Sequence, residues 1–441
     1  MTRVVIIGHE SAGFTAACSA KAADRRAEVT VIERRKHPLY HPCGMPFAIG
    51  EEIDLKNLIE NTRAPNVNLR LGTEAKSIDL TARIVEVTEL KSGKTETISY
   101  DSLILATGGC PSRPPIPGVD LGGVHVLRTI EDAEAIIEAA KKAKRAVVVG
   151  GGTIGVETSA ALKRRGLETL LVELMPHVLP TILDQDMAEL VVERLQKEEV
   201  HVLCSQQLGE IKGKEKVKSV VVGGEEHPAD LVVMATGVKP EVKLAEEAGL
   251  TLGVTGGIKV DQYLRTNDPY VFAAGDCVET KNLITGKPSL SPLAPIAIKM
   301  GRTAGENAVG GKSTFEGISN TVVTSVHELV IASAGVTTEK AEEAGMEVVS
   351  SRIRTLNKPS YLPGAKPIYI KLIVEIKERR LVGGQIISTN GVAERVNLLS
   401  FVIQKGMRVE ELADMEYCYM PALSNTIEPL TIAAEAVLRK L

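Results

Sequence analysis

The sequence predicts an α/β protein with two similar parallel-sheet units and a C-terminal α+β domain. Two strand–helix–strand segments with glycine-rich turns, one at the start and one near the middle, form an internal repeat. The strands are built from Val, Ile, Leu and Ala, and the chain has no Trp, a composition typical of parallel sheets buried on both faces. From about Thr321 strands are followed by helices instead of alternating with them, which indicates a different architecture.

Length, composition and charge narrow the class of protein. A chain of 441 residues has room for about three domains of roughly 150 residues. Its 44% hydrophobic and 24% charged residues are ordinary for a folded protein. The net charge is -4 and the sequence has no block of like charge. It therefore predicts neither a basic surface that binds nucleic acid nor a polybasic patch that binds membranes, and we expect small-molecule partners. The first apolar run, VVII, is too short for a signal sequence, and we expect a cytoplasmic protein.

The first repeat unit extends from Arg3 to Glu33. A strand (VVII) is followed by a glycine turn (GHESAG), an Ala-rich helix from Gly13 to Ala23 and a second strand (EVTVIE). The turn is an incomplete dinucleotide motif, because Glu10 occupies the middle glycine position. Glu33 ends the second strand, where a carboxylate can bind a ribose. The residues expected to contact a dinucleotide are Gly8, Ser11, Ala12, Gly13, Glu33 and Arg34.

The second unit carries the complete motif. The strand AVVVG leads into GGTIGVE at the start of a helix, and the next strand ends at Glu173. The glycines allow a tight turn, close approach of a pyrophosphate and close helix packing, and the helix N-terminus attracts the phosphates. Glu173 would repel a 2′-phosphate, which favours NADH over NADPH, although a glycine turn without cofactor is an alternative. The expected contacts are Gly150, Gly152, Thr153, Ile154, Gly155, Glu157 and Glu173.

Three further short segments mark the nucleotide sites. Two apolar strands end in the same turn, Ala-Thr-Gly, at residues 106–108 and 235–237. The segment TNDPYVFAAGDC ends another strand with an aspartate that can meet a flavin ribityl hydroxyl. We expect cofactor contacts from Ala106, Thr107, Gly108, Thr236, Gly237, Gly275, Asp276, Leu293 and Ala294.

Together these motifs resemble the pyridine nucleotide-disulfide oxidoreductase family over nearly the whole chain. The resemblance implies two interleaved Rossmann-like domains, with FAD in the first and NADH in the second, and a C-terminal dimerisation domain. The boundaries are then 1–112 with 242–320 for the FAD domain, 113–241 for the NADH domain and 321–441 for dimerisation.

The cysteines identify one candidate redox centre. Six cysteines are scattered without a CxxC pair, so neither a metal site nor a disulfide framework is expected. A lone cysteine is usually a buried hydrophobe. Cys43, however, lies in HPCGMPF about ten residues after Glu33, which places it near the flavin in such a fold. We expect its pKa to be lowered by the flavin environment and by His41, which is also counted among the cofactor contacts.

A single active cysteine suggests the branch that contains NADH oxidases, NADH peroxidases, coenzyme A disulfide reductases and persulfide reductases. The oxidases and peroxidases typically carry a histidine where this chain has Ser11, although His9 is an alternative acid–base group. The CGMPF run and the segments around Tyr361 and Tyr419 resemble those of the reductases. In that branch such tyrosines reach the cysteine of the partner subunit, so the resemblance implies a homodimer and a catalytic role for both phenols.

Coenzyme A is the candidate bound thiol, with three departures from the reductase pattern. Ser19 and Ala22 stand where arginines usually face the coenzyme, with Lys21 and Arg25 as substitutes. The segment after Leu58 is short, and the last aromatic of the C-terminal tyrosine motif is replaced by a leucine. The expected reaction is reduction of a persulfide, polysulfide or coenzyme A disulfide. NADH oxidation by oxygen and a flavin redox sensor without turnover are the alternatives.

Overall fold

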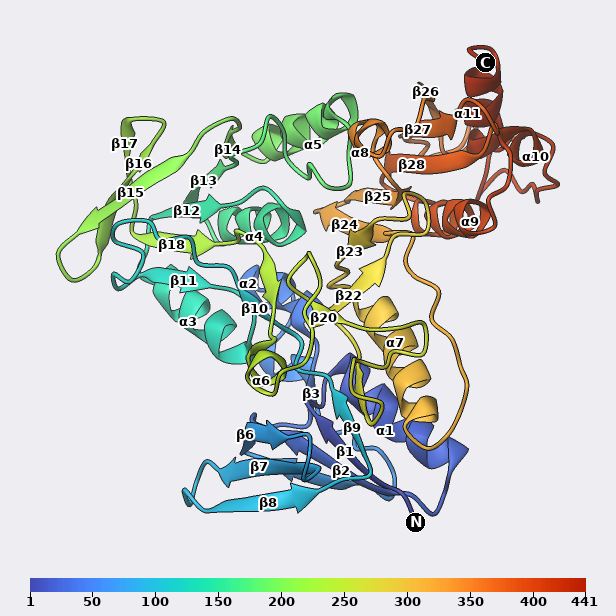
Figure 1. The fold of residues 1–441 in the computed structure, drawn as a ribbon. Coiled ribbons are helices and arrows are strands. Elements are labelled where there is room, and N and C mark those ends of the chain that lie inside the picture. The colour runs from blue at the N-terminus through green and yellow to red at the C-terminus, as the bar shows by residue number, and fades with distance from the viewer.

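The computed structural model describes residues 1–441 and contains three five-stranded sheets (Figure 1). The first sheet is parallel, in the order β21-β9-β1-β2-β5. Its strands are β1 (Arg3–Ile7), β2 (Glu28–Glu33), β5 (Asn68–Leu71), β9 (Ser102–Leu105) and β21 (Val271–Ala273). Because β21 comes so late in the chain, the chain builds a second unit before it completes the first sheet.

Two helices pack side by side on the first sheet, α1 (Ser11–Ala23) and α7 (Ala294–Asn307) (Figure 1). Their close approach depends on glycines. A Cβ atom at Gly301 or Gly305 of α7 would lie 2.3 Å from a main-chain oxygen of α1, that of Ala12 or Ala16. The later part of the first unit, which carries α7, therefore packs directly on the helix that follows the first glycine turn.

The second sheet is also parallel, in the order β11-β18-β12-β13-β14. Its strands are β11 (Val124–Val126), β12 (Arg145–Val149), β13 (Glu168–Val172), β14 (Val200–Leu203) and β18 (Leu231–Met234). The helices α3 (Ile130–Ala140), α4 (Thr153–Arg164) and α5 (Gln185–Lys197) contribute to the largest cluster on this sheet. The run of valines in β12 is buried, as expected for a strand covered on both faces.

The third sheet is antiparallel, in the order β24-β25-β28-β27-β26. Its strands are β24 (Val322–Val326), β25 (Leu329–Gly335), β26 (Val348–Leu356), β27 (Pro367–Glu375) and β28 (Leu381–Ser388). It packs against α9 (Ala393–Gln404) and α11 (Pro429–Leu438), and α8 (Thr338–Glu343) and α10 (Val409–Ala413) complete this part. The fold class predicted from the sequence, two interleaved Rossmann-like units and an α+β dimerisation domain, is confirmed.

Short ladders and turns join the three sheets. Two antiparallel meanders consist of β6 (Thr73–Asp79), β7 (Ile84–Glu89) and β8 (Thr95–Ser99), and of β15 (Leu208–Gly213), β16 (Val217–Val222) and β17 (Glu225–Pro228). Smaller ladders pair β3 (Leu39–Tyr40) with β4 (Ile59–Glu60), β10 (Gly109–Pro111) with β19 (Val238–Pro240), and β20 (Ile258–Lys259) with β22 (Val278–Lys281) and β23 (Pro288–Ser289). The short helices are η1 (Pro42–Gly44), α2 (Met45–Ile49), η2 (Leu55–Leu58) and α6 (Lys243–Glu247). No helix combines the length and the apolar character that crossing a membrane requires.

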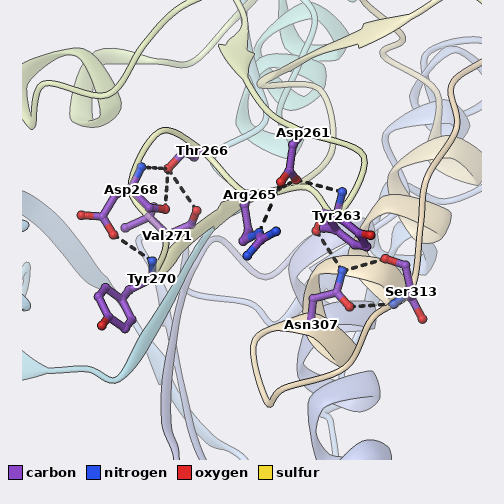
Figure 2. Close-up of polar contacts among 9 residues, drawn as sticks. All are labelled: Asp261, Tyr263, Arg265, Thr266, Asp268, Tyr270, Val271, Asn307 and Ser313. Carbon is purple, nitrogen blue, oxygen red and sulfur yellow. Dashed lines mark hydrogen bonds and ion pairs between the residues drawn. The ribbon is translucent and has the colours of Figure 1, made fainter.

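A polar network fixes the turn that leads into β21 (Figure 2). The Asp261 carboxylate accepts hydrogen bonds from the main-chain amides of Tyr263 and Arg265, at 2.8 and 2.9 Å. At the end of α7, the Asn307 side chain donates to the main-chain oxygens of Tyr263 and Ser313, at 2.9 and 2.8 Å. The network therefore joins the turn before β21 to the C-terminal end of α7.

Candidate active site

A single cavity of about 1430 Å³ lies where the carboxyl ends of the first two sheets face each other. Ligand sites of doubly wound sheets are found at such edges. The cavity is lined by most of the residues that the sequence pointed to: Gly8, Ser11, Ala12, Glu33, Arg34, Cys43, Ala106, Thr107, Gly108, Gly150, Gly152, Thr153, Ile154, Glu157, Glu173, Thr236, Gly237, Gly275, Asp276, Leu293 and Ala294. Gly13, Gly155, His41, Tyr361 and Tyr419 do not line it.

The first glycine turn needs its glycines for packing. Gly8 has a φ of +101°, and a Cβ atom there would lie 2.2 Å from the main-chain oxygen of Ala106. A Cβ atom at Gly13 would lie 1.9 Å from the oxygen of Gly8. The turn is thus pressed between α1 and the end of β9, which leaves the N-terminus of α1 directed at the cavity. Amide groups at such a helix end can hold a pyrophosphate.

The second glycine turn repeats this geometry. Gly150 has a φ of +106°, and its Cβ atom would lie 2.3 Å from the oxygen of Ala235. A Cβ atom at Gly155 would lie 1.8 Å from the oxygen of Gly150. At Gly152, by contrast, a Cβ atom would meet nothing within 4 Å, so the main chain there is open to a ligand. The two Ala-Thr-Gly turns recur in the sequence because each supports one glycine turn.

The carboxylates at the ends of β2 and β13 hold these turns in place. Glu173 is buried and accepts the amide hydrogens of Gly151 and Met175, at 2.5 and 2.7 Å. Glu33 is buried and accepts from the amides of His9 and Arg35, both at 2.9 Å. Burial alone would raise the pKa of Glu33, but the guanidinium of Arg35, bonded at 2.8 Å, outweighs it and lowers that pKa.

Glu10, which replaces the middle glycine of the first motif, lies in the cavity beside these groups. Its carboxylate forms an ion pair with Arg35 at 2.9 Å. Burial nevertheless raises the pKa of Glu10 to about 7. The sequence identified Glu10 as a departure from the motif but did not reveal its pairing with Arg35, which comes from a different strand end.

Arg128 is a cavity residue that the sequence analysis missed. Its guanidinium forms an ion pair with Asp276 at 2.9 Å, and its main-chain oxygen accepts a hydrogen bond from the Tyr40 hydroxyl at 2.8 Å. Arg128 directly precedes Thr129, which caps α3 in a capping box with Asp132. That capping signal, Thr-x-x-Asp before an apolar run, was readable in the sequence and would have placed Arg128 at the exposed start of a helix.

Cys43 lies in the 3-10 turn η1, exposed at the edge of the cavity. The turn packs closely against the following segment, since a Cβ atom at Gly44 would lie 2.3 Å from the Leu58 side chain. The surrounding protein raises the pKa of the Cys43 thiol, first through burial and then through the charge of Glu157, while Arg128 acts in the opposite direction.

The structure does not bring His41 into the cavity. Its imidazole is exposed, does not line the cavity and pairs with the Glu60 carboxylate at 2.9 Å. His41 does not act on Cys43, whose pKa is raised and not lowered by the protein groups around it. The β3–β4 ladder explains this, because it places His41 opposite the segment that carries Glu60.

His9 does not compensate for the missing histidine at Ser11. Its ring is fully buried, Nδ1 lies 2.8 Å from the main-chain oxygen of Pro38, and its edge packs on Phe14. Burial lowers the pKa of His9. The imidazole is therefore a packing group beneath the turn after β2, outside the cavity.

Lys21 does not replace the missing arginines either. Its ammonium group donates to the main-chain oxygens of Arg25 and Ala27, at 2.7 and 2.9 Å, and so closes the C-terminal end of α1. Arg25 is exposed, and Ser19 and Ala22 lie nearby on the same helix.

The two tyrosines lie far from the cavity of their own chain. Tyr361 and Tyr419 are 71% and 46% exposed, on the loops after β26 and before α11. The side chain of Asn425 fastens these loops together through a 2.6 Å hydrogen bond to the oxygen of Leu356. The neighbouring Tyr419 phenol raises the pKa of Tyr361, while Thr426 and then Tyr361 lower the pKa of Tyr419. The structure places both hydroxyls together on an exposed face.

Known proteins match the chain over its full length. Residues 2–301 match the family described as pyridine nucleotide-disulphide oxidoreductase, and residues 319–430 match its dimerisation domain. An NADH oxidase of Methanocaldococcus jannaschii is 39% identical, covering 100% of this chain and 99% of the relative. A CoA-dependent NAD(P)H sulfur oxidoreductase of Pyrococcus furiosus is 32% identical, covering 99% of each chain. The structure of an NAD-dependent persulfide reductase from A. fulgidus has a TM-score of 0.96 at 37% identity, covering 99% of this chain and 83% of the other.

Proposed function

Because the chain belongs to the pyridine nucleotide-disulphide oxidoreductase family, we propose that it uses FAD and NADH to reduce a sulfur–sulfur bond through Cys43. One observation carries the proposal: a single exposed cysteine lies at the edge of the cavity that both glycine turns face. The candidate substrates are a persulfide, a polysulfide or coenzyme A disulfide. The name of the P. furiosus relative and that of the persulfide reductase structure support this class.

The residues at the first turn fit FAD. The open N-terminus of α1 suits the pyrophosphate, and the Gly-Asp turn after β21 presents Asp276 to the same cavity. The Ala-Thr-Gly turn after β9 and residues 293–294 at the start of α7 complete the wall. Bound FAD would accept hydride from NADH and pass the electron pair to sulfur.

NADH would bind at the second turn. The pyrophosphate would lie over Gly152, where the main chain is open, and the ribose hydroxyls would donate to Glu173. Glu157, one turn into α4, would lie near the nicotinamide. Thr236 and Gly237 would contact the cofactor from the end of β18.

Cys43 would act as the nucleophile. Its thiolate attacks the sulfane or disulfide sulfur of the substrate, forms a Cys43–sulfur bond as the S–S bond breaks, and displaces sulfide or a thiol. The resulting mixed disulfide is cleaved by the two electrons that NADH supplies, which regenerates the thiolate and releases the second thiol. Since the protein groups raise the pKa of Cys43, its ionisation depends on further positive charge or hydrogen bonds supplied when the cofactor and the second subunit are in place.

We further propose a homodimer in which Tyr361 and Tyr419 approach Cys43 of the partner subunit, with the domain boundaries given by the family resemblance. The exposure of both phenols, on loops that the Asn425 side chain joins, supports this assignment. Coenzyme A remains the proposed thiol component; Lys21 is engaged at the end of α1, which leaves the exposed Arg25 as the proposed cation for its phosphates.

An assay without oxygen tests the proposal. Anaerobic NADH oxidation is measured with coenzyme A disulfide, coenzyme A persulfide, glutathione persulfide and polysulfide, for the unchanged protein, for Cys43→Ser and for Cys110→Ser as the control. Turnover with at least one substrate that is lost only in Cys43→Ser supports the proposal, and mass spectrometry should then find a thiol or sulfur adduct on Cys43. A free Cys43 thiol under all conditions contradicts it.

NADH oxidation by oxygen is the second candidate, favoured by the name of the M. jannaschii relative. Ser11 argues against it, because no histidine faces Cys43 from the first turn. An oxidase would consume NADH only in the presence of oxygen, whereas a redox sensor without turnover would not be bleached by NADH at all.

A further inference from the structure

The third sheet contributes to the cavity between the first two. Asn320, Val322 and Val323, which lead into and begin β24, line the cavity together with the glycine turns. The strand β24 packs against α4, the helix that follows the second glycine turn. Part of the dimerisation domain therefore forms one wall of the NADH side of the site.

One hydrogen bond joins this wall to a cavity carboxylate. The hydroxyl of Thr324 donates to Oε1 of Glu157 at 2.5 Å, across 167 residues of sequence. Thr324 is 5% exposed, and β24 is held in register by five residue pairs with β25, one of which includes Thr324. The hydroxyl is thus fixed by a strand and not by a mobile loop.

No cation balances Glu157. None of the ion pairs in the structure includes it, and Oε2 has no hydrogen-bond donor in the protein. Burial raises the pKa of Glu157, and the Thr324 hydrogen bond lowers it in part. The charge of Glu157 raises the pKa of the Cys43 thiol. Asp276 raises the same pKa, and Arg128 lowers it. A buried carboxylate held by one hydroxyl is well suited to interact with a ligand that brings its own positive charge.

We propose that Thr324 is a positioning residue for NADH oxidation: it orients the Glu157 carboxylate so that Oε2 faces the nicotinamide ring. The ring of NADH is neutral and becomes a pyridinium cation when the hydride leaves with its electron pair. A fixed negative charge beside the ring stabilises the product cation more than the reactant. The inference rests on the proposed function, since it takes the ligand at the second glycine turn to be NADH.

NAD⁺ binding gives a test that involves no turnover. The dissociation constant of NAD⁺ is measured by calorimetry on the oxidised, FAD-loaded protein between pH 5 and pH 9. In the unchanged protein, binding should tighten with rising pH as Glu157 ionises beside the cationic ring, and Glu157→Gln should abolish this dependence. Thr324→Val removes a hydrogen bond to a charged group. The midpoint of the pH dependence of NAD⁺ binding should therefore move upward by about one pH unit.

Two variants serve as matched controls. Thr324→Ser keeps the hydroxyl and should retain the midpoint of the unchanged protein. Ser325→Ala, on the next residue of β24, removes a hydroxyl for which the structure shows no hydrogen bond and should change nothing. Thr324→Ala provides the same test as Thr324→Val if the valine variant does not fold, and the FAD absorbance of each protein reports its integrity.

A Thr324→Val midpoint equal to that of the unchanged protein refutes the positioning role while leaving the proposed function intact. Failure of the unchanged protein to bind NAD⁺ at any pH refutes both. A shift of the same size in Ser325→Ala also refutes the inference, because the effect would then come from the strand and not from the hydroxyl.

Discussion

Replacing Glu10 by Gln should stabilise the protein at alkaline pH and have a much smaller effect at acid pH. The Glu10 carboxyl faces Arg35, with which it pairs at 2.9 Å, and also senses Glu33 and Arg128. Burial outweighs the two cations and raises the pKa of Glu10 from 4.5 to about 7. Glutamine has nearly the same shape as the protonated acid but cannot ionise, so the variant isolates the cost of the buried charge.

The size and sign of the effect follow from linkage. Between pH 4.5 and about 7 the folded protein binds more protons at Glu10 than the unfolded chain does. The free energy of unfolding therefore falls as the pH rises through this window and is constant above it. A shift of this size corresponds to about 3 kcal/mol, since one pKa unit equals about 1.4 kcal/mol. This is an upper value, because the Glu10 side chain is 29% exposed and solvent screens its charge.

Thermal unfolding followed by circular dichroism measures the effect in FAD-free protein. At pH 8.5 the melting temperature of Glu10→Gln should exceed that of the unchanged protein by several degrees. In a domain of about 150–250 residues, each kcal/mol of unfolding free energy raises the melting temperature by about 2–4 °C. At pH 5, close to the lower end of this window, the difference should be only about a quarter as large. Glu342→Gln, an exposed glutamate on α8, is the control and should show no difference at either pH. A gain of equal size at pH 5 and pH 8.5, or no gain at all, would refute the reasoning.

Three further predictions concern the tyrosines, the ribose carboxylate and helix packing. If the Tyr419 phenol assists the departing thiolate, Tyr419→Phe should reduce sulfur turnover by up to about 10²-fold and leave flavin bleaching by NADH intact. Full activity of the Tyr361→Phe, Tyr419→Phe double variant would contradict a catalytic role for the two phenols. Glu173→Ala should weaken the preference for NADH over NADPH, measured as the ratio of kcat/KM values, and an unchanged ratio would contradict the assignment. Gly305→Ala should cost about 1–3 kcal/mol of unfolding free energy, because its Cβ would lie 2.3 Å from the Ala16 oxygen; a neutral result in urea unfolding would show that α1 and α7 can separate freely.

The repeated motifs predicted the fold and most of the cavity wall because each motif is a packing solution within a short stretch of chain. Gly8 and Gly150 must be glycine since their Cβ atoms would collide with the Ala-Thr-Gly turns, and this requirement leaves a clear local signature. The same reasoning placed Glu173 and Asp276 on the correct edges of their sheets.

Contacts between distant segments could not be predicted in this way. The orientation of His41 is set by Glu60 on a two-residue ladder, and a motif that short has no periodicity to recognise. Likewise, the partner of Glu157 is Thr324, which belongs to a different sheet, and nothing local to either residue indicates the hydrogen bond. Arg128 is marked in the sequence only by the helix cap that begins beside it, which signals the start of a helix and not a cofactor site.

The late return of the chain to the first sheet has a consequence for biosynthesis. The strands of the second sheet lie in one continuous stretch, from β11 to β18, whereas β9 must wait for its neighbour β21 and α1 for α7. During translation the second unit can therefore reach its native structure while the first remains incomplete, with the α7-facing side of α1 exposed. Nascent chains that stop before residue 307 should consequently be the species that need a chaperone and that proteases remove.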